Sequence, residues 1–303
     1  MSGQERHCME LFEDMRTKRH HAVVGLDTDY IHLPLSVLRA DVGDAMFDFN
    51  ARIVEVTADV AAGYKLNLGF YFKKGLKGLE AMYRSVQMIH EIAPGAAVIA
   101  DVKTGDIGSS NEAWATGLFD EFGFDAATFH FYTGKEAMQP FLVRADKAII
   151  ILCRTSNPGG GEFQDLEVVD PKLPAVTGKP LYQVVAQHVA EQWNYNGNCM
   201  IVAGATYPAE LRYLSQHWPE QWKLIPAVGK QGGKAKDVVE NATAEGKFRA
   251  VINSSRGVIL AYSDEKFLAR HPEFRGRPEK FAEAARVAML ELDNEITATL
   301  ALV

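Results

Sequence analysis

The sequence has little cysteine, no excess of positive charge and no long hydrophobic run. Its three cysteines, Cys8, Cys153 and Cys199, lie far apart and form no Cys-x-x-Cys pair, which disfavours a disulfide framework and a zinc site. The net charge of -7 disfavours a general nucleic-acid binder, because phosphate neutralisation needs a broad basic face. No apolar run approaches the length of a membrane span, and the charged first twenty residues do not resemble a signal peptide. We therefore expect a cytoplasmic protein that binds neither nucleic acid nor membrane.

The chain does contain a regular alternation of strand-like and helix-like segments. A length of 303 residues by itself suggests two domains, but α/β barrels of this length are commonly one domain. Eight apolar runs of strand character alternate with helical segments, and no linker or block of charge separates two halves. The predicted strands cover residues 22–27, 63–67, 96–103, 125–130, 147–153, 199–203, 222–226 and 250–254. This order predicts a single parallel (β/α)8 TIM barrel domain over residues 1–303, with an additional N-terminal helix.

The predicted helices follow the spacing of apolar residues on one helical face. They cover residues 5–19, 43–61, 70–92, 109–122, 134–144, 181–193, 208–217 and 278–301. Residues 154–180 begin with a Pro- and Gly-rich segment and are predicted as a long irregular loop, of the kind that often forms a lid or binding element. A doubly wound sheet is the main alternative. It needs a glycine-rich fingerprint after the first strand, and residues 25–28 have none.

The segment with the densest chemistry is Asp101-Val102-Lys103-Thr104-Gly105-Asp106. Asp101 and Lys103 are two residues apart on a predicted strand, so their side chains are expected on the same side of it. Asp106 follows a glycine and is expected on a loop. A carboxylate and an ammonium held side by side at a strand end form either a structural ion pair or part of a site, and spacing alone leaves both readings open.

Other polar residues also follow predicted strands. In a barrel the carboxyl ends of the strands meet at one rim, where sites are built, so the rim should collect Asp27, Lys65, Asp101, Lys103, Ser156, Gln231 and Arg256. No set of His, Asp and Glu has the spacing of metal ligands. Two glycine-rich segments, residues 229–233 and 254–257, occupy positions where barrels often bind phosphate, and Arg256 adds a bidentate cation. Two tight turns are the alternative reading.

These residues together resemble a known family. The Asp-x-Lys-x-x-Asp-Ile run at 101–107 with Asn111-Glu112 is similar to that of orotidine 5'-phosphate decarboxylases, in particular the longer bacterial members. The similarity extends to the segments at 25–27, 49–50, Lys65, 132–134, 155–159, 202–208, 229–233 and 253–256. It implies a (β/α)8 barrel that converts orotidine 5'-phosphate to uridine 5'-phosphate in pyrimidine synthesis, without cofactor or metal, as a homodimer with shared active sites.

The resemblance also implies a role for each matching residue. Lys65, Asp101, Lys103 and Asp106 would form the catalytic set, with Asp106 contributed by the neighbouring subunit. Ser110 would cross the same interface towards the ribose. Asp27 would bind a ribose hydroxyl, Ser156 the pyrimidine edge, and Gln231 and Arg256 the 5'-phosphate. Three positions, Asn67, Ala227 and Lys230, depart from the usual pattern.

Three other functions are alternatives. A metal-dependent sugar-phosphate synthase or lyase shares the short Asp-x-Lys-x-x-Asp motif, and its activity would be lost with a chelator. A non-catalytic nucleotide-binding barrel would be expected to lack one of the four catalytic residues, and all four are present. A Schiff-base aldolase would depend on a single lysine that borohydride traps with the substrate.

Overall fold

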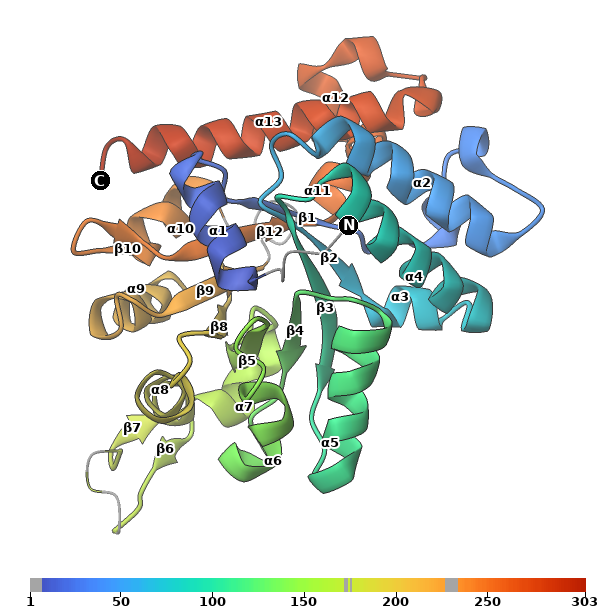
Figure 1. The fold of residues 1–303 in the computed structure, drawn as a ribbon. Coiled ribbons are helices and arrows are strands. Elements are labelled where there is room, and N and C mark those ends of the chain that lie inside the picture. Colours follow the sequence, from blue (N-terminus) through green and yellow to red (C-terminus); the bar gives the residue numbers. More distant parts are fainter. Residues whose placement is uncertain (1–6, 172–173, 175, 227–233) are drawn as a thin grey trace.

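The computed structural model describes residues 7–171, 174, 176–226 and 234–303. Eight parallel strands form a closed barrel in the order β1-β12-β9-β8-β5-β4-β3-β2, which confirms the predicted (β/α)8 architecture (Figure 1). In chain order, every barrel strand pairs with the one before it. The barrel strands are β1 (Ala22–Gly25), β2 (Gly63–Asn67), β3 (Ala97–Thr104), β4 (Ala126–Phe129), β5 (Ala148–Arg154), β8 (Cys199–Ala203), β9 (Trp222–Ile225) and β12 (Ala250–Ser254).

The helices surround the barrel, and the longest of them, α13, closes the chain (Figure 1). Most coincide with predicted helices, and two, α5 and α8, continue into π-helical turns at Thr116–Glu121 and Val189–Trp193. The helices are α1 (Cys8–Thr17), α2 (Val42–Thr57), α3 (Leu68–Phe72), α4 (Gly75–Ile92), α5 (Gly108–Ala115), α6 (Gly134–Leu142), α7 (Gly161–Gln164), α8 (Leu181–His188), α9 (Pro208–His217), α10 (Ala235–Ala242), α11 (Arg256–Ile259), α12 (Glu265–Arg270) and α13 (Phe281–Leu300).

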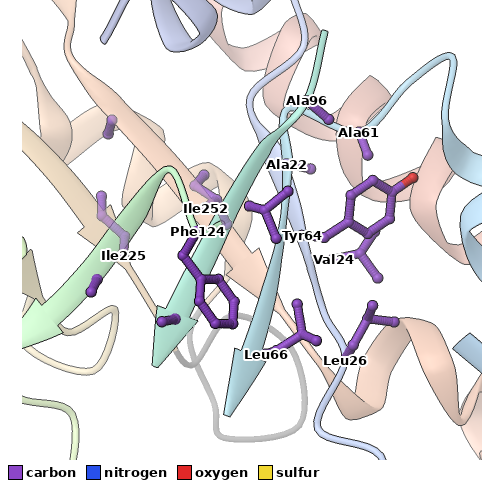
Figure 2. Close-up of a cluster of buried hydrophobic side chains, with 14 of the residues drawn as sticks. Ala22, Val24, Leu26, Ala61, Tyr64, Leu66, Ala96, Phe124, Ile225 and Ile252 are labelled. Carbon is purple, nitrogen blue, oxygen red and sulfur yellow. The ribbon is translucent and has the colours of Figure 1, made fainter. Parts of the chain in front are cut away.

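Side chains along the strands alternate between two apolar layers. Val24 and Tyr64 belong to the outer layer between the strands and the helices, part of which is shown in Figure 2. Val23 belongs to the layer inside the barrel, together with residues of α1. From α1, Phe12 stacks on Trp222, the first residue of β9, with ring centroids 5.9 Å apart. The N-terminal helix therefore closes the amino-terminal end of the barrel and leaves the opposite end for a site.

The helix predicted over residues 70–92 is two helices, and that prediction is wrong in its first part. α3 begins earlier, at Leu68, where the side chain of Asn67 accepts a hydrogen bond from the Gly69 amide. α4 then begins at Gly75, which has a φ of +59°. Glycine adopts this left-handed conformation readily because it has no Cβ, so the chain can turn between the two helices.

The segment over residues 154–180 is not irregular throughout, contrary to the prediction. It contains α7 and an antiparallel pair of two-residue strands, β6 (Glu167–Val168) and β7 (Lys179–Pro180). After β9 the chain also forms α10, the paired strands β10 (Thr243–Ala244) and β11 (Lys247–Phe248), and α12, none of which was expected. Elements of two to eight residues are too short to produce a clear periodic pattern in the sequence.

Within the described ranges, every helix is too short or too polar to cross a membrane.

Candidate active site

A cavity of about 500 Å³ opens at the carboxyl end of the barrel. Its apolar part consists of Leu152, Val202, Leu224 and Pro226. Of the residues predicted for the site, those that line the cavity are Asp27, Lys65, Asp101, Lys103, Ser156 and Arg256. The strand ends therefore bring together most of the residues that the sequence placed at the rim.

Lys65, Asp101 and Lys103 form a row of alternating charges in this cavity, and Asp27 lies at the Lys65 end of the row. The Lys65 ammonium lies 2.7 Å from Asp101 Oδ2 and 3.5 Å from Asp27 Oδ1. Lys103 Nζ lies 2.5 Å from the other oxygen of the same carboxylate, Asp101 Oδ1. Asn67, which departs from the family pattern, donates to Asp101 Oδ2 over 3.4 Å. Asp101 is thus shared between two cations, one buried and one half-exposed to the cavity.

Ionisation of this row is set by competing effects. Burial disfavours the charged form of Asp101, but the attraction and hydrogen bonds of Lys65 and Lys103 outweigh it and hold the pKa of this carboxyl well below its usual range. Burial alone would lower the pKa of Lys65, but the negative charges and hydrogen bonds of Asp101 and Asp27 outweigh burial and raise this pKa above its ordinary value. The Asp101 carboxyl is therefore ionised and paired with the Lys65 ammonium at neutral pH.

Asp101 and Lys103 meet as predicted, but regular strand alternation is not the reason. Lys103 has a φ of +49°, in the left-handed region that residues with a Cβ rarely adopt. The pairing register of β3 with β4 shifts between Ala100 and Thr104. The two side chains therefore approach each other across a bulge and not along a straight strand.

Ser156 is held by contacts to the segment that follows β8. The Thr206 hydroxyl donates to the Ser156 carbonyl over 3.0 Å. A Cβ on Gly204 would lie only 2.8 Å from the Ser156 backbone, so glycine is required where these two segments touch.

Arg154 at the end of β5 also supports this loop, although it was not among the predicted site residues. It is buried, lies 3.1 Å from Asp165 and 3.5 Å from Glu210, and stacks over the ring of Tyr207 at 3.9 Å. A buried arginine paired with two carboxylates and an aromatic face is a rigid anchor. The signal available in the sequence was an arginine directly after an apolar strand.

Arg256 lies at the start of α11, on the β12 side of the cavity. Asn253 and Ser255 line the same wall. A Cβ on Gly25 would lie 1.9 Å from the Ser255 hydroxyl oxygen, so β1 can approach this wall only with glycine there. The predicted phosphate residue Gln231, and the departures Ala227 and Lys230, lie outside the described residues.

Asp106 and Ser110 do not join the cavity of their own chain. Asp106 lies on a loop, as predicted, and both side chains are exposed outside the cavity lining. The side chain of Asn111 holds this loop in place. It accepts a hydrogen bond from the Asp106 amide and donates to the carbonyls of Asp106 and Ala137. Asn111 is fully buried and holds the backbone at Asp106 in place. Asp106 itself is exposed, and its Oδ1 accepts from the Ile107 amide over 2.7 Å.

The described ranges contain no group of three or more His, Cys, Asp or Glu side chains placed to hold a metal ion.

Comparison with known proteins decides the family. The sequence profile of the "Orotidine 5'-phosphate decarboxylase / HUMPS family" matches residues 23–270. The chain belongs to this family. The orotidine 5'-phosphate decarboxylase of Herpetosiphon aurantiacus is 42% identical over 251 residues, covering 83% of this chain and 88% of that protein. The enzyme of the same name from Roseiflexus castenholzii is 37% identical and covers 96% of this chain and 99% of that protein.

Solved structures give the same result. The OMP decarboxylase of Leishmania donovani is 30% identical, with a TM-score of 0.76 over 97% of this chain and 99% of that one. The UMP synthase of the same organism is 31% identical with a TM-score of 0.78, and the chain spans 57% of its length. The predicted resemblance to orotidine 5'-phosphate decarboxylases is therefore confirmed, and these relatives support that activity over the alternatives.

Proposed function

We propose that this chain converts orotidine 5'-phosphate to uridine 5'-phosphate in pyrimidine nucleotide synthesis, in the cytoplasm and without a cofactor. The observation that carries the proposal is the row of Lys65, Asp101 and Lys103 at the mouth of the barrel cavity, in a chain of the decarboxylase family. The row supplies a fixed negative charge and a cation with a transferable proton, side by side, where a ligand can reach them.

The reaction breaks the bond between C6 of the pyrimidine and its carboxylate. Carbon dioxide leaves, and the electron pair of the bond stays on C6, where the ring has no neighbouring group to accept it. A cation beside C6 stabilises this charge, and transfer of a proton to C6 completes the product. Lys103 is suited to both steps, because its ammonium is half-exposed to the cavity while Asp101 holds it in place.

Asp101 and Lys65 have complementary roles in this scheme. Asp101 stays ionised, so a substrate carboxylate beside it is repelled, and its loss as neutral carbon dioxide removes that repulsion. Lys65 is buried against Asp101 and Asp27. It keeps Asp101 charged and holds both carboxylates in place.

The remaining cavity residues bind the parts of the substrate that do not react. Asp27 contacts a ribose hydroxyl, Ser156 the pyrimidine edge, and Arg256 the 5'-phosphate together with Gln231. Support comes from the positions of Asp27, Ser156 and Arg256 around one cavity. Phosphate contacts far from C6 provide binding energy that holds the ring against Lys103.

The test is an ultraviolet assay of orotidine 5'-phosphate consumption in the presence of EDTA. We expect turnover by the wild type and a fall in kcat of at least about 10³-fold in Lys103→Ala, because both charge stabilisation and proton transfer are lost. Lys266→Ala, which removes an exposed lysine on α12, is the matched control and should behave as the wild type. No turnover by the wild type, or robust turnover by Lys103→Ala, refutes the proposal. Activity lost in EDTA and restored by metal points to the metal-dependent alternative.

We further propose that the chain works as a homodimer in which Asp106 and Ser110 enter the partner's active site. Support comes from the exposure of both residues outside their own cavity and from the hydrogen bonds by which Asn111 holds the Asp106 backbone. Large apolar side chains are also exposed in the segments that follow the paired strands β3 and β4, including Ile107 and Tyr132, which is 89% exposed. An exposed apolar surface of this kind is typical of a protein interface, and a second copy would cover it.

Subunit mixing tests the shared site. Lys103→Ala and Asp106→Ala are each expected to be inactive as pure proteins. A mixed dimer of the two has one site that receives Lys103 from one chain and Asp106 from the other. After random exchange about half of the dimers are mixed, so about one quarter of the wild-type activity should return. If Asp106 acts within its own chain, mixing restores nothing.

A further inference from the structure

A buried threonine that is not among the predicted site residues contacts both Asp101 and Lys103. Thr128 lies on β4 and is 1% exposed. Its hydroxyl oxygen accepts hydrogen bonds from the backbone amides of Val102 at 3.1 Å and Lys103 at 3.0 Å. The same hydroxyl donates to Asp101 Oδ1 over 3.0 Å. One side chain therefore touches three successive residues of β3.

The direction of these three hydrogen bonds follows from the chemistry of the groups. A backbone N–H can only donate, so the hydroxyl must be the acceptor for both amides and uses its two lone pairs on them. Its single proton is then left for the carboxylate of Asp101. Each donor and acceptor of Thr128 is matched once, with Asp101 Oδ1 as the acceptor. An ionised Asp101, which its lowered pKa favours, is a strong acceptor for this hydrogen bond.

The strand geometry shows why this contact is needed. Ala100 of β3 pairs with Ala127 of β4, but the next pair is Thr104 with Phe129. Three residues of β3 therefore lie opposite Thr128 alone, and the amides of Val102 and Lys103 are bound by its side chain. Lys103, in the middle of this bulge, adopts a left-handed φ of +49°. Such a conformation is unfavourable for a residue with a Cβ and persists only where the surroundings hold it.

We propose that Thr128 is a positioning residue for decarboxylation: its hydroxyl holds the bulge that turns the Lys103 ammonium back against Asp101 and fixes it at the reacting carbon. Thr128 acts through Lys103 and Asp101 and takes no proton itself. This inference rests on the proposed function. The part of it that concerns the conformation of Lys103 can be tested without measuring activity.

The first test compares kcat and KM of Thr128→Val and Thr128→Ser. Valine keeps the shape of threonine but removes the hydroxyl, so we expect kcat to fall about 100-fold, as for a reacting group displaced by about 1 Å. KM should change less than threefold, because the phosphate side of the cavity is untouched. Serine keeps the hydroxyl, so Thr128→Ser should return kcat to within about threefold of the wild type.

A matched control separates this role from the general loss of a buried hydroxyl. Thr57 on α2 is also buried, and its hydroxyl contacts the Ile53 carbonyl and the Tyr64 hydroxyl, in the outer layer away from the cavity. Thr57→Val should lower the melting temperature and leave kcat unchanged. Equal effects of the two valine variants on kcat contradict the proposal, as does a Thr128→Ser variant as slow as Thr128→Val.

A second readout does not depend on turnover. In a crystal structure of Thr128→Val, Lys103 should leave the left-handed region and its ammonium should separate from Asp101 Oδ1. If Lys103 keeps its wild-type φ and contact, the proposal is wrong. If the wild type fails to decarboxylate orotidine 5'-phosphate, the proposed function fails, and this structural comparison still decides the role of Thr128. Failure of both Thr128→Val and Thr128→Ala to fold would make the hydroxyl a requirement of the barrel and would also overturn the proposal.

Discussion

Replacing Lys65 by methionine tests the physical account of the charged row most directly. Lys65 is buried, and its ammonium lies between Asp101 at 2.7 Å and Asp27 at 3.5 Å. Methionine has similar length and fills the space with an apolar chain, so the substitution removes the charge with little change in packing. Two carboxylates then share a largely buried environment with one cation fewer.

The short distance between Lys65 and Asp101 implies a large loss of stability in Lys65→Met. Unit charges 2.7 Å apart attract by about 6 kcal/mol at an effective dielectric constant of about 20. Much of this attraction offsets the loss of hydration of Lys65 and Asp101, and removal of one partner from a buried pair costs about 3–5 kcal/mol. Because the total free energy of unfolding of a protein is about 5–15 kcal/mol, we expect Lys65→Met to lose a large part of it.

Urea unfolding at pH 7 measures this loss, and a double-mutant cycle assigns it. Asp101→Asn alone removes the carboxylate with which Lys65 and Lys103 both pair, so it should also lower the free energy of unfolding. In Lys65→Met/Asp101→Asn both charges are absent, so the double variant should be more stable than the sum of the single losses implies, with a coupling energy of at least about 1.5 kcal/mol.

The stability difference between the wild type and Lys65→Met should also depend on pH. The pKa of Asp101 is depressed in the folded protein, so its contribution to stability is present above the unfolded pKa and is lost as the pH falls through the folded pKa. Without Lys65 that folded pKa is higher. The stability difference between the wild type and Lys65→Met should therefore narrow as the pH falls from 7 towards 3. A loss below about 1 kcal/mol at pH 7, or a difference that widens in acid, refutes the reasoning.

Three further predictions concern other parts of the chain. Phe12→Ala, which removes the ring stacked on Trp222 at the closed end of the barrel, should lower the free energy of unfolding by about 3–5 kcal/mol while a folded fraction keeps its kcat; loss of kcat with unchanged stability contradicts this. Burial lowers the pKa of His21 to about 4, so the free energy of unfolding of the wild type should fall by about 3 kcal/mol between pH 6.5 and 4. Urea unfolding of His21→Gln should show a smaller fall in stability over the same pH range. Arg256→Ala should lower kcat/KM by about 10- to 100-fold, the effect of a lost charge-assisted contact, and unchanged kcat/KM would exclude Arg256 from the phosphate site.

The barrel could be predicted from the sequence because its strands are buried on both faces. Runs such as residues 147–153 and 199–203 are continuously apolar, which is typical of parallel strands covered by helices, and the order of these runs determines the order of strands around the barrel. The same logic placed Lys65 and Asp101 at one rim, because all parallel strands end on the same side.

The short elements and supporting contacts could not be predicted in this way. α7 and the β6–β7 pair are too short to have a periodic pattern. Asn111 lies inside α5, which begins at Gly108, and its buried side chain binds the Asp106 loop. A polar side chain can bind any nearby backbone group, and its partner is known only when the fold brings that group close.

The order of apolar runs and the local motifs are enough to predict the barrel, the family and most of the residues at the rim. How Asp101 and Lys103 meet is seen only in the folded chain. Their contact depends on a left-handed residue, Lys103, inside a bulge, and that conformation is bound by a hydroxyl from the neighbouring strand, on Thr128. Local propensity disfavours such a turn for a lysine, so a long-range hydrogen bond must hold it, and the partner in a long-range contact is set by the fold.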